Sequence, residues 1–330
     1  MNLLIHFIEF DIIFCIEDNI VEKVYEFWKN CLDICYIDFN IEVKDAWTIY
    51  AKKVPEGDEN HFWDFEEKII VNYYSCPHDL TEHNAFLREC ITKIALYSGI
   101  LWVHASAFRI REKVVLVLGE KNAGKTTWVL NAVINLNAEF IGNDQLPLFL
   151  CEGKLSTVGW RPDVKIRSSS LEVLGINDKG IVQADRHYLQ LNGALEVDIE
   201  GLSAKNGYSI EKIDCWNSKI HTCFMETVNV DNIIYIGKIR EGNNISYFWK
   251  KVFEDDRENL LPHYLCDWCE NMNYWTERIG NIRIASNARK NEMKIYNHLK
   301  KIPVKILDSR MSIEGINKFL IYDMLEYNFT

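Results

Sequence analysis

One loop near the middle of the chain carries residue types suited to holding a chain of phosphates. It fits the pattern GxxxxGK[ST], in which glycines let the backbone turn sharply so that successive N–H groups face one anion. Lys125 then reaches the β- and γ-phosphates, and the Thr126 hydroxyl ligates magnesium. We therefore predict that ATP and Mg²⁺ bind here, the alternative being a glycine-rich turn without a ligand. The predicted binding residues are Gly119, Glu120, Lys121, Asn122, Ala123, Gly124, Lys125, Thr126 and Thr127.

A carboxylate that follows this loop is the second candidate group. A phosphate-binding loop of this kind needs an acidic partner for the metal, normally an aspartate at the end of a neighbouring strand. Asp144 follows Thr126 by 18 residues and comes shortly after an apolar stretch, so it suits that place. Read without the loop, an Asn-Asp pair favours a turn or a cap. Together with the loop, Asp144 is predicted to ligate magnesium.

The hydrophobic pattern around the loop predicts the elements that position it. Residues 114–118 form a fully apolar run typical of a buried strand, and residues 125–136 carry apolar side chains at helical spacing. Strands are predicted for residues 139–141 and 146–150, on either side of Asp144. This order of strand, loop, helix and strand is typical of an α/β nucleotide-binding core. Upstream of it, a single strand is predicted for residues 100–108.

We predict two domains that meet at about residue 98. Residues 1–98 mix short strand-like runs with helical stripes and predict an α+β accessory domain, which is a natural candidate for substrate choice. Residues 99–330 are predicted to form the catalytic domain, an α/β fold whose P-loop core has a mixed β-sheet flanked by helices. Its later elements are predicted at 232–238 (strand), 290–299 (helix), 304–307 (strand) and 313–325 (helix).

Composition excludes some classes of partner. Hydrophobic residues make up 48% and charged residues 26% of the chain, as in a globular protein. The net charge of −11 argues against a nucleic-acid partner, because such binding depends on neutralising phosphates. No uninterrupted apolar run reaches the ~20 residues of a membrane span. Glu9 and Asp11 interrupt the apolar N-terminal stretch, so we expect no signal peptide, no membrane association and a cytoplasmic location.

Three features around the loop go beyond a generic phosphate-binding motif. His104-Ala-Ser106 precedes the loop, Asp144 follows it, and Leu-Glu-Val-Leu-Gly stands at Leu171–Gly175. Together they resemble the HPr kinase/phosphorylase family, a relative of phosphoenolpyruvate carboxykinase. That family has a histidine on the strand before the loop, an Asp-Asp pair after the loop helix, and a Leu-Glu-Val/Ile signature. The resemblance covers residues from about 102 to 177.

The resemblance implies a role for each matching residue. Lys125 would hold the phosphates, and Asp144 would be the general base that takes the proton from an attacking hydroxyl. His104 would be an active-site residue, and Glu172 would hold magnesium. Arg186 is a further candidate for a phosphate or substrate contact. The alternatives are a core histidine for His104, a helix-terminal charge for Glu172, and a solvated surface charge for Arg186.

Two positions depart from the family's pattern. Asn143 replaces the first aspartate of the pair and so removes a charge that would help metal binding or base function. Leu174 stands where the signature carries an arginine. The second departure argues against the phosphorylase reaction and against the protein HPr as the substrate.

A closer resemblance is to the HPr-kinase-like proteins with a His-Ala-Ser strand, which include the lasso-peptide kinases. Those enzymes phosphorylate a serine of a precursor peptide. The resemblance therefore implies an ATP-dependent kinase whose partner is a serine-bearing peptide or protein. Two other classes stay open: a small-molecule hydroxyl kinase, acting for instance on free serine, and a non-catalytic regulatory nucleotide-binding module. The oligomeric state is left open, a homo-oligomer included.

Overall fold

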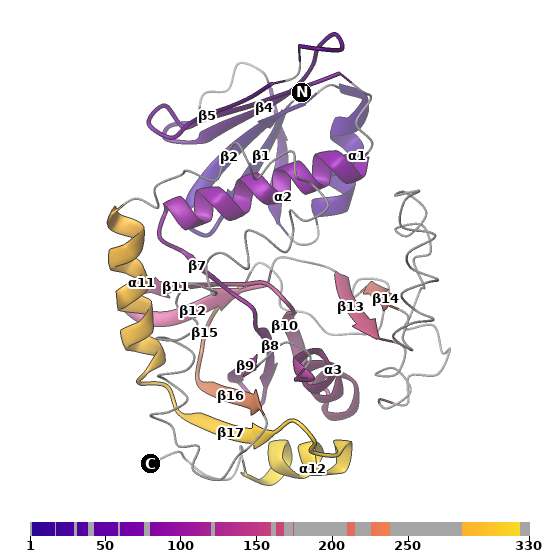
Figure 1. The fold of residues 1–330 in the computed structure, drawn as a ribbon, viewed down its shortest axis with the longest axis vertical. Coiled ribbons are helices and arrows are strands. Elements are labelled where there is room, and N and C mark those ends of the chain that lie inside the picture. The colour runs from indigo at the N-terminus through magenta and orange to yellow at the C-terminus, as the bar shows by residue number, and fades with distance from the viewer. Residues whose placement is uncertain are drawn as a thin grey trace. The chain divides into compact units, whose positions relative to one another are not determined.

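The fold is mixed α/β, with several mixed sheets flanked by helices, as the sequence predicts (Figure 1). It is known from a computed structural model, which describes residues 2–16, 18–29, 32–38, 43–58, 60–75, 80–119, 123–159, 163–167, 174, 210–214, 226–237 and 286–323. None of the described helices has the length and apolar character needed to cross a membrane.

The chain divides into two compact units. The first comprises Met1–Trp102, Pro147–Phe149 and Glu258–Asn297. The second comprises Val103–Leu146, Leu150–Arg257 and His298–Thr330. The accessory and catalytic domains, with their boundary near residue 98, stay predictions.

A six-stranded mixed sheet forms the base of the first unit. Its strand order is β3-β1-β2-β4-β6-β5, in which β2, β4 and β6 run parallel and the other pairs run antiparallel. Helices α1 and α2 contact each other, and α1 contacts β1 and β3. The elements are β1 (Asn2–Phe7), β2 (Phe10–Cys15), α1 (Asp18–Trp28), β3 (Asp33–Ile37), β4 (Trp47–Lys53), β5 (Asn60–Asp64), β6 (Ile69–Tyr74), α2 (Leu80–Tyr97) and most of α11 (Ser286–Leu299).

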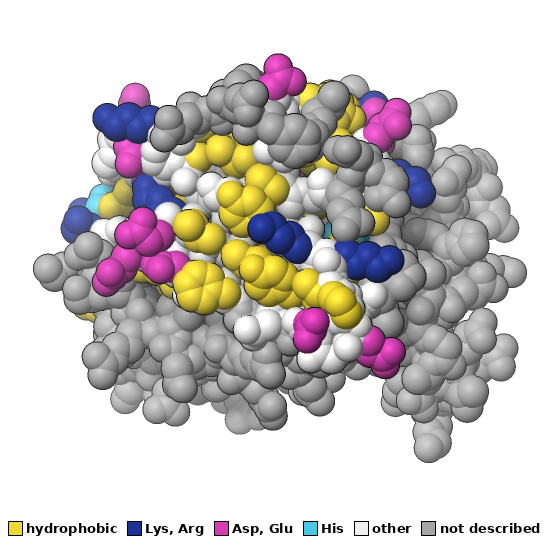
Figure 2. Space-filling model, turned by 90° about the horizontal axis from the view of Figure 1, so that it is seen from above, with side chains coloured by type: hydrophobic (Ala, Val, Ile, Leu, Met, Phe, Trp, Pro, Cys, Tyr) yellow, Lys and Arg dark blue, Asp and Glu magenta, His cyan; other side chains and the backbone are white. Residues whose placement is uncertain are grey.

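Alternation along these strands decides which side chains are buried. Leu3, Phe14, Ile49 and Ile70 form one row across four paired strands, and each is fully buried. The side chains between them on each strand point to the other face. There the Lys52 ammonium lies 4.6 Å from the centre of the Tyr50 ring. Figure 2 shows apolar side chains, with Lys or Arg side chains among them, on the surface seen from above.

The second unit contains the sheet that positions the predicted site. Its strand order is β10-β8-β9-β16-β17. Strands β9, β16 and β17 are parallel, whereas β8 runs antiparallel to both β9 and β10. The carboxyl ends of β10, β9, β16 and β17 therefore share one edge with the amino end of β8, and we call it the carboxyl edge. The strands are β8 (Ser106–Ile110), β9 (Lys113–Gly119), β10 (Glu139–Gly142), β16 (Asn232–Gly237) and β17 (Val304–Asp308).

Helix α3 (Lys125–Leu136) covers one face of this sheet and holds the core of the second unit. It contacts β8, β9 and β10, and α12 (Ile313–Lys318) contacts it in turn. Trp128 is 2% exposed, and its ring meets the ring of Phe319, which begins a short π-helix (Phe319–Asp323) after α12. The smaller sheets have the orders β15-β12-β11-β7 and β13-β14. Their strands are β7 (Leu101–Val103), β11 (Leu146–Cys151), β12 (Lys154–Val158), β13 (Asp163–Arg167), β14 (Ile210–Asp214) and β15 (Thr227–Asn229).

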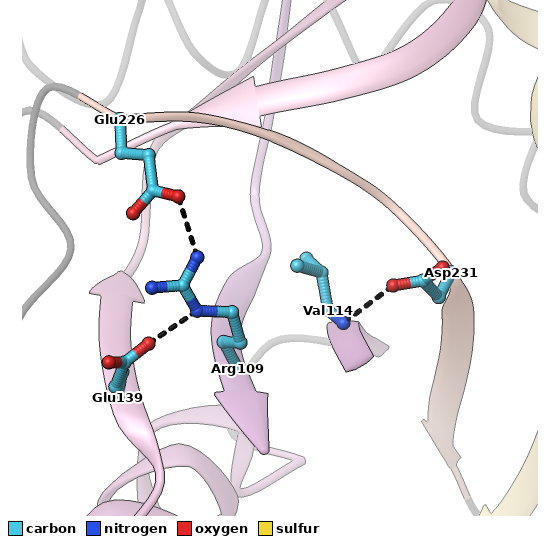
Figure 3. A network of polar contacts seen from close by, with 5 residues as sticks. All are labelled: Arg109, Val114, Glu139, Glu226 and Asp231. Atoms are coloured by element: carbon cyan, nitrogen blue, oxygen red, sulfur yellow. Dashed lines mark hydrogen bonds and ion pairs between the residues drawn. The ribbon is translucent and has the colours of Figure 1, made fainter. Parts of the chain in front are cut away.

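A polar network ties together the opposite edge of the five-stranded sheet (Figure 3). Arg109 of β8 pairs with Glu139 of β10, and its Nη1 donates to Glu226 over 2.7 Å. The Val114 N–H, at the start of β9, donates to the Asp231 carboxylate over 2.9 Å. The ion pairs are partly exposed, so each contributes little stability alone. These bonds link β8 to β10 and to the residue before β15, and they link β9 to the residue before β16.

The structure confirms some predicted elements and corrects others. Helix α3 spans the predicted residues 125–136, and the strand predicted at 114–118 is β9. The single strand predicted for 100–108 is wrong, because β7 and β8 are separated by a turn at His104 and Ala105. The helix predicted for 313–325 is α-helical only to Lys318. An apolar run indicates burial, and it does not reveal a turn that lacks glycine or proline.

The close approach of α11 to the end of α2 predicts a stability difference between two glycine substitutions. Gly99 has φ of 88°, and a Cβ there would lie 2.2 Å from Nδ2 and 3.0 Å from Cβ of Asn291. Gly57 has φ of 94°, but a Cβ there would have no atom within 4 Å. We expect Gly57→Ala to lower the free energy of unfolding by about 1 kcal/mol through backbone strain alone. Gly99→Ala is expected to lower it by about 2–4 kcal/mol.

Urea denaturation followed by circular dichroism measures both values. Equal losses in the two variants would contradict the predicted crowding at Gly99.

Candidate active site

The loop between β9 and α3 lies on the carboxyl edge and presents backbone N–H groups. The N-cap of α3 is Gly124, with φ of 94°, which has no side chain to cap the first turn. An anion is therefore the natural acceptor for these N–H groups, and the helix dipole favours it. At the start of the loop, a Cβ on Gly119 would lie 2.5 Å from the Ile236 carbonyl oxygen on β16. Only glycine allows the two backbones to lie this close.

Lys125 is the buried cation of the site. Its residue is 5% exposed, and its Nζ donates to the Gly119 carbonyl over 3.0 Å. Burial lowers the pKa of Lys125 from 10.5 to about 8, although the Asp144 carboxylate partly opposes this. The ammonium is thus charged at neutral pH at a desolvation cost. A phosphate group that contacted it would offset that cost, so the residues present fit an anionic ligand.

The amide oxygen of Asn143 joins three segments at this edge. It accepts a hydrogen bond of 2.6 Å from Ser106 Oγ, at the start of β8, and one of 3.0 Å from Thr126 Oγ1 on α3. Asn143 is 5% exposed and Ser106 fully buried. Because the Thr126 hydroxyl donates its proton to Asn143, its lone pairs remain available to a cation. Asn143 therefore accepts both bonds through a neutral amide oxygen.

The sequence alone indicates no role for Ser106, and it shows Asn143 only as the loss of a charge. The one available signal for Ser106 was its place in the sequence motif His104-Ala-Ser106. The pairing of Ser106 with Asn143 depends on the register of β8 and β10, which the sequence does not show.

His104 and Asp144 face each other from two tight turns. The Ala105 N–H donates to the Val103 carbonyl over 2.9 Å, and the Gln145 N–H donates to the Asn143 carbonyl over 2.8 Å. Each candidate is thus the central residue of a three-residue turn. His104 Nε2 lies 3.5 Å from Asp144 Oδ1, and the side chains are 40% and 43% exposed. His104 therefore lies in a turn, and its predicted place on a strand is wrong.

The backbone at Asp144 is in an unusual conformation. Its φ is 65°, in the left-handed region that aspartate and asparagine tolerate better than most residues. Such strain is found often at functional sites. The Asp144 side chain is 43% exposed, so a group from solvent can reach its carboxylate.

Several predicted site residues lie outside the described part of the chain: Glu120, Lys121, Asn122, Glu172 and Arg186. Leu174 is described, and it is 5% exposed in the core that α3 covers. A leucine at the family's arginine position therefore packs the core. The described residues offer Thr126 and Asp144 to a metal, and they include no group of three or more His, Cys, Asp or Glu side chains that could hold one.

Comparison with known proteins finds no matching family model and no matching curated protein. Among solved structures, the chain is similar to the HPr(Ser) kinase/phosphatase from Coxiella burnetii. The identity is 15%, the TM-score is 0.25, and the match covers 44% of this chain and 70% of the other. A TM-score of this size does not establish a common fold.

The buried charge of Lys125 predicts that its removal stabilises the ligand-free protein. Lys125→Met keeps the volume and removes the desolvated ammonium, so the free energy of unfolding should rise by about 1–3 kcal/mol at pH 7. Because the folded pKa is below 10.5, the unfolded chain binds more protons between pH 8 and 10.5. The stability contribution of this group therefore rises with pH over that window in wild type, and not in the variant.

Chemical denaturation at pH 7, 8, 9 and 10 tests this, with Lys113→Met as control. Lys113 begins β9 at the opposite edge of the sheet, and its side chain is 58% exposed. A Lys125→Met protein that is less stable than wild type would contradict the predicted cost of burial.

The two hydrogen bonds to Asn143 predict that one substitution lowers stability and that another raises the affinity for Mg²⁺. Asn143→Ala leaves the Ser106 hydroxyl without its acceptor and should lower the free energy of unfolding by about 1–3 kcal/mol. Asn143→Asp keeps an acceptor and adds a charge beside Thr126, so Mg²⁺ affinity should rise several-fold. Calorimetric titration with Mg²⁺ in the presence of ATP and thermal denaturation measure these effects.

A matched control is Asn229→Ala, which removes an acceptor for Ser156 Oγ at 3.0 Å within the β12–β15 pair. It should leave Mg²⁺ affinity unchanged. An equal change of Mg²⁺ affinity in Asn143→Asp and Asn229→Ala would refute the role given to Asn143.

Proposed function

We propose that this chain is an ATP-dependent kinase that transfers the γ-phosphoryl group to a serine hydroxyl of a peptide or protein. One observation carries the proposal: the glycine loop with its buried lysine and the solvent-accessible Asp144 share the carboxyl edge of one sheet. In this proposal the second unit contains a P-loop core. The residues before it form an accessory domain that selects the substrate.

The phosphates of ATP are held by groups that already point at this edge. The first N–H groups of α3 donate to them, and the Lys125 ammonium neutralises part of their charge. Thr126 and Asp144, with Glu172 as a further proposed ligand, would hold Mg²⁺, which supplies additional charge neutralisation on the phosphates. Burial of Lys125 strengthens its electrostatic effect on the charge that develops during transfer.

Asp144 is the proposed general base. Its carboxylate accepts the proton of the serine hydroxyl while the serine oxygen bonds to the γ-phosphorus. The bond between that phosphorus and the β–γ bridging oxygen breaks, and ADP leaves with the bridging oxygen. His104, whose Nε2 lies 3.5 Å from Asp144 Oδ1, orients the carboxylate.

The exposure of the two candidate catalytic side chains supports a large acceptor. His104 and Asp144 remain two-fifths exposed, as a base must be if it is to meet a hydroxyl on a peptide chain. A kinase for a small metabolite would instead enclose its substrate and exclude water around the base. The acceptor we propose is therefore a serine on a peptide, as in the HPr-kinase-like peptide kinases.

Transfer of label from γ-labelled ATP tests the proposal. Wild type, Asp144→Asn and Lys125→Ala are incubated with Mg²⁺, a serine-peptide library and a pool of hydroxyl metabolites. Asp144→Asn should lose about 100-fold or more of the transfer rate while it still binds ATP. Lys125→Ala should lose both the transfer activity and the binding of ATP. The control Asp231→Asn makes the same chemical change at the opposite edge and should behave like wild type.

The amide at Asn143 favours one competing function, a regulatory nucleotide-binding module, because the site has one carboxylate fewer than the family's pattern. Tight ATP binding without any labelled acceptor, in wild type and Asp144→Asn alike, combined with loss of ATP binding in Lys125→Ala, would establish that alternative in place of the kinase. Label found on a metabolite would move the activity to the small-molecule class.

A further inference from the structure

A second polar feature lies on the carboxyl edge, two strands away from the glycine loop. Strand β17 ends at Asp308, which pairs with Gly237 of β16. On its other side, β16 pairs Ile236 with Gly119 of β9. Two inter-strand spacings separate β17 from β9, or roughly 10 Å. The Ser309 N–H donates to the Gly237 carbonyl over 2.9 Å and anchors the turn that follows β17.

This turn holds an arginine in one orientation. The Asp308 carboxylate accepts bonds from the Arg310 backbone N–H (2.8 Å), from Nε (2.9 Å) and from Nη2 (2.5 Å). The bidentate contact lowers the pKa of Asp308 to about 2, so the pair stays charged at working pH. The Arg310 side chain is nevertheless 76% exposed. Its guanidinium is thus oriented by the turn, while one side of it faces solvent.

The positions of the other candidates determine which end of a bound nucleotide this turn would meet. Asp144 follows the carboxyl end of β10, and His104 precedes the amino end of β8. Both strands lie on the same side of β9. The γ-phosphate must lie beside Asp144 for transfer. The triphosphate lies at the loop after β9. Its nucleoside end must then extend to the other side, toward β16 and β17. Strand β16 ends in Gly237, which has no side chain to stand in that path.

We propose that the Asp308–Arg310 turn binds the nucleoside end of ATP, an inference that rests on the proposed function of the glycine loop. The Arg310 guanidinium stacks on the purine ring and donates its outward N–H groups to the base. Asp308 is a positioning residue, because it holds the guanidinium plane and reduces the ordering cost of binding. The turn gives the site its preference for a nucleotide over a bare polyphosphate.

Calorimetric titrations with ATP and with inorganic triphosphate test this inference. The proteins are wild type, Arg310→Ala, Arg310→Lys and Lys125→Ala. The matched control is Arg111→Ala, an exposed arginine in the β8–β9 hairpin at the opposite edge. Arg310→Ala should weaken ATP binding by about 5- to 20-fold and change triphosphate binding less than about twofold. Arg310→Lys should lose most of the same affinity, because an ammonium has no plane to stack. Arg111→Ala should change neither.

Two outcomes overturn the inference while leaving the phosphate site intact. An equal loss of affinity for ATP and for triphosphate in Arg310→Ala would make Arg310 a phosphate contact, and no loss would make its turn structural only. A different result identifies failure of the proposed function: wild type binds neither ligand, or Lys125→Ala binds both as wild type does. In that case the inference about Arg310 fails together with the proposed function.

Discussion

The arrangement of the candidate site depends on one acceptor, the amide oxygen of Asn143. It holds the hydroxyl of Ser106 at the start of β8 and the hydroxyl of Thr126 in the first turn of α3. These two residues come from segments that flank the glycine loop on both sides. Because Asp144 follows Asn143 directly, the same contact also sets where the candidate base lies. A change of a few tenths of an ångström here would move the proposed metal ligand Thr126, helix α3 and the proposed base Asp144 together.

Stability and ligand binding make opposite demands on Lys125. The folded chain keeps an ammonium under nearly complete burial and leaves the first turn of α3 without a side-chain cap. Both features cost stability in the absence of a ligand, and one bound anion would satisfy both. Strain at Asp144 belongs to the same pattern, because the left-handed conformation costs free energy in a residue that carries a Cβ. The rest of the unit offsets these costs through the apolar core beneath α3.

The two edges of the five-stranded sheet are built differently. At the edge away from the loop, Arg109 and Asp231 bind neighbouring strands through side-chain contacts (Figure 3). At the carboxyl edge, tight turns carry the candidate polar groups and expose them to solvent. The contrast follows from direction: strands that run parallel bring their loops to one end. Polar side chains from different loops can therefore gather there, from Asp144 on one side to Arg310 on the other.

Much of the local structure was readable from the sequence. The GxxxxGK[ST] spacing, the helix over 125–136 and the strand before it follow from glycine chemistry and from the period of the apolar residues. The break at His104 was not readable, because an apolar run with a small residue in it indicates burial rather than a turn. Nor was the use of Leu174 in the core, since its neighbours in space are far away in the chain.

The sequence by itself determined which residues could bind phosphate and which local elements carry them. Only the tertiary structure decided that His104 faces Asp144, that Ser106 and Thr126 share one acceptor, and that Arg310 lies two strands from the loop. The physical reason is that strand order, direction and register are non-local. They depend on which apolar faces bury each other, and a strand's own residues specify that it is buried without specifying its neighbour.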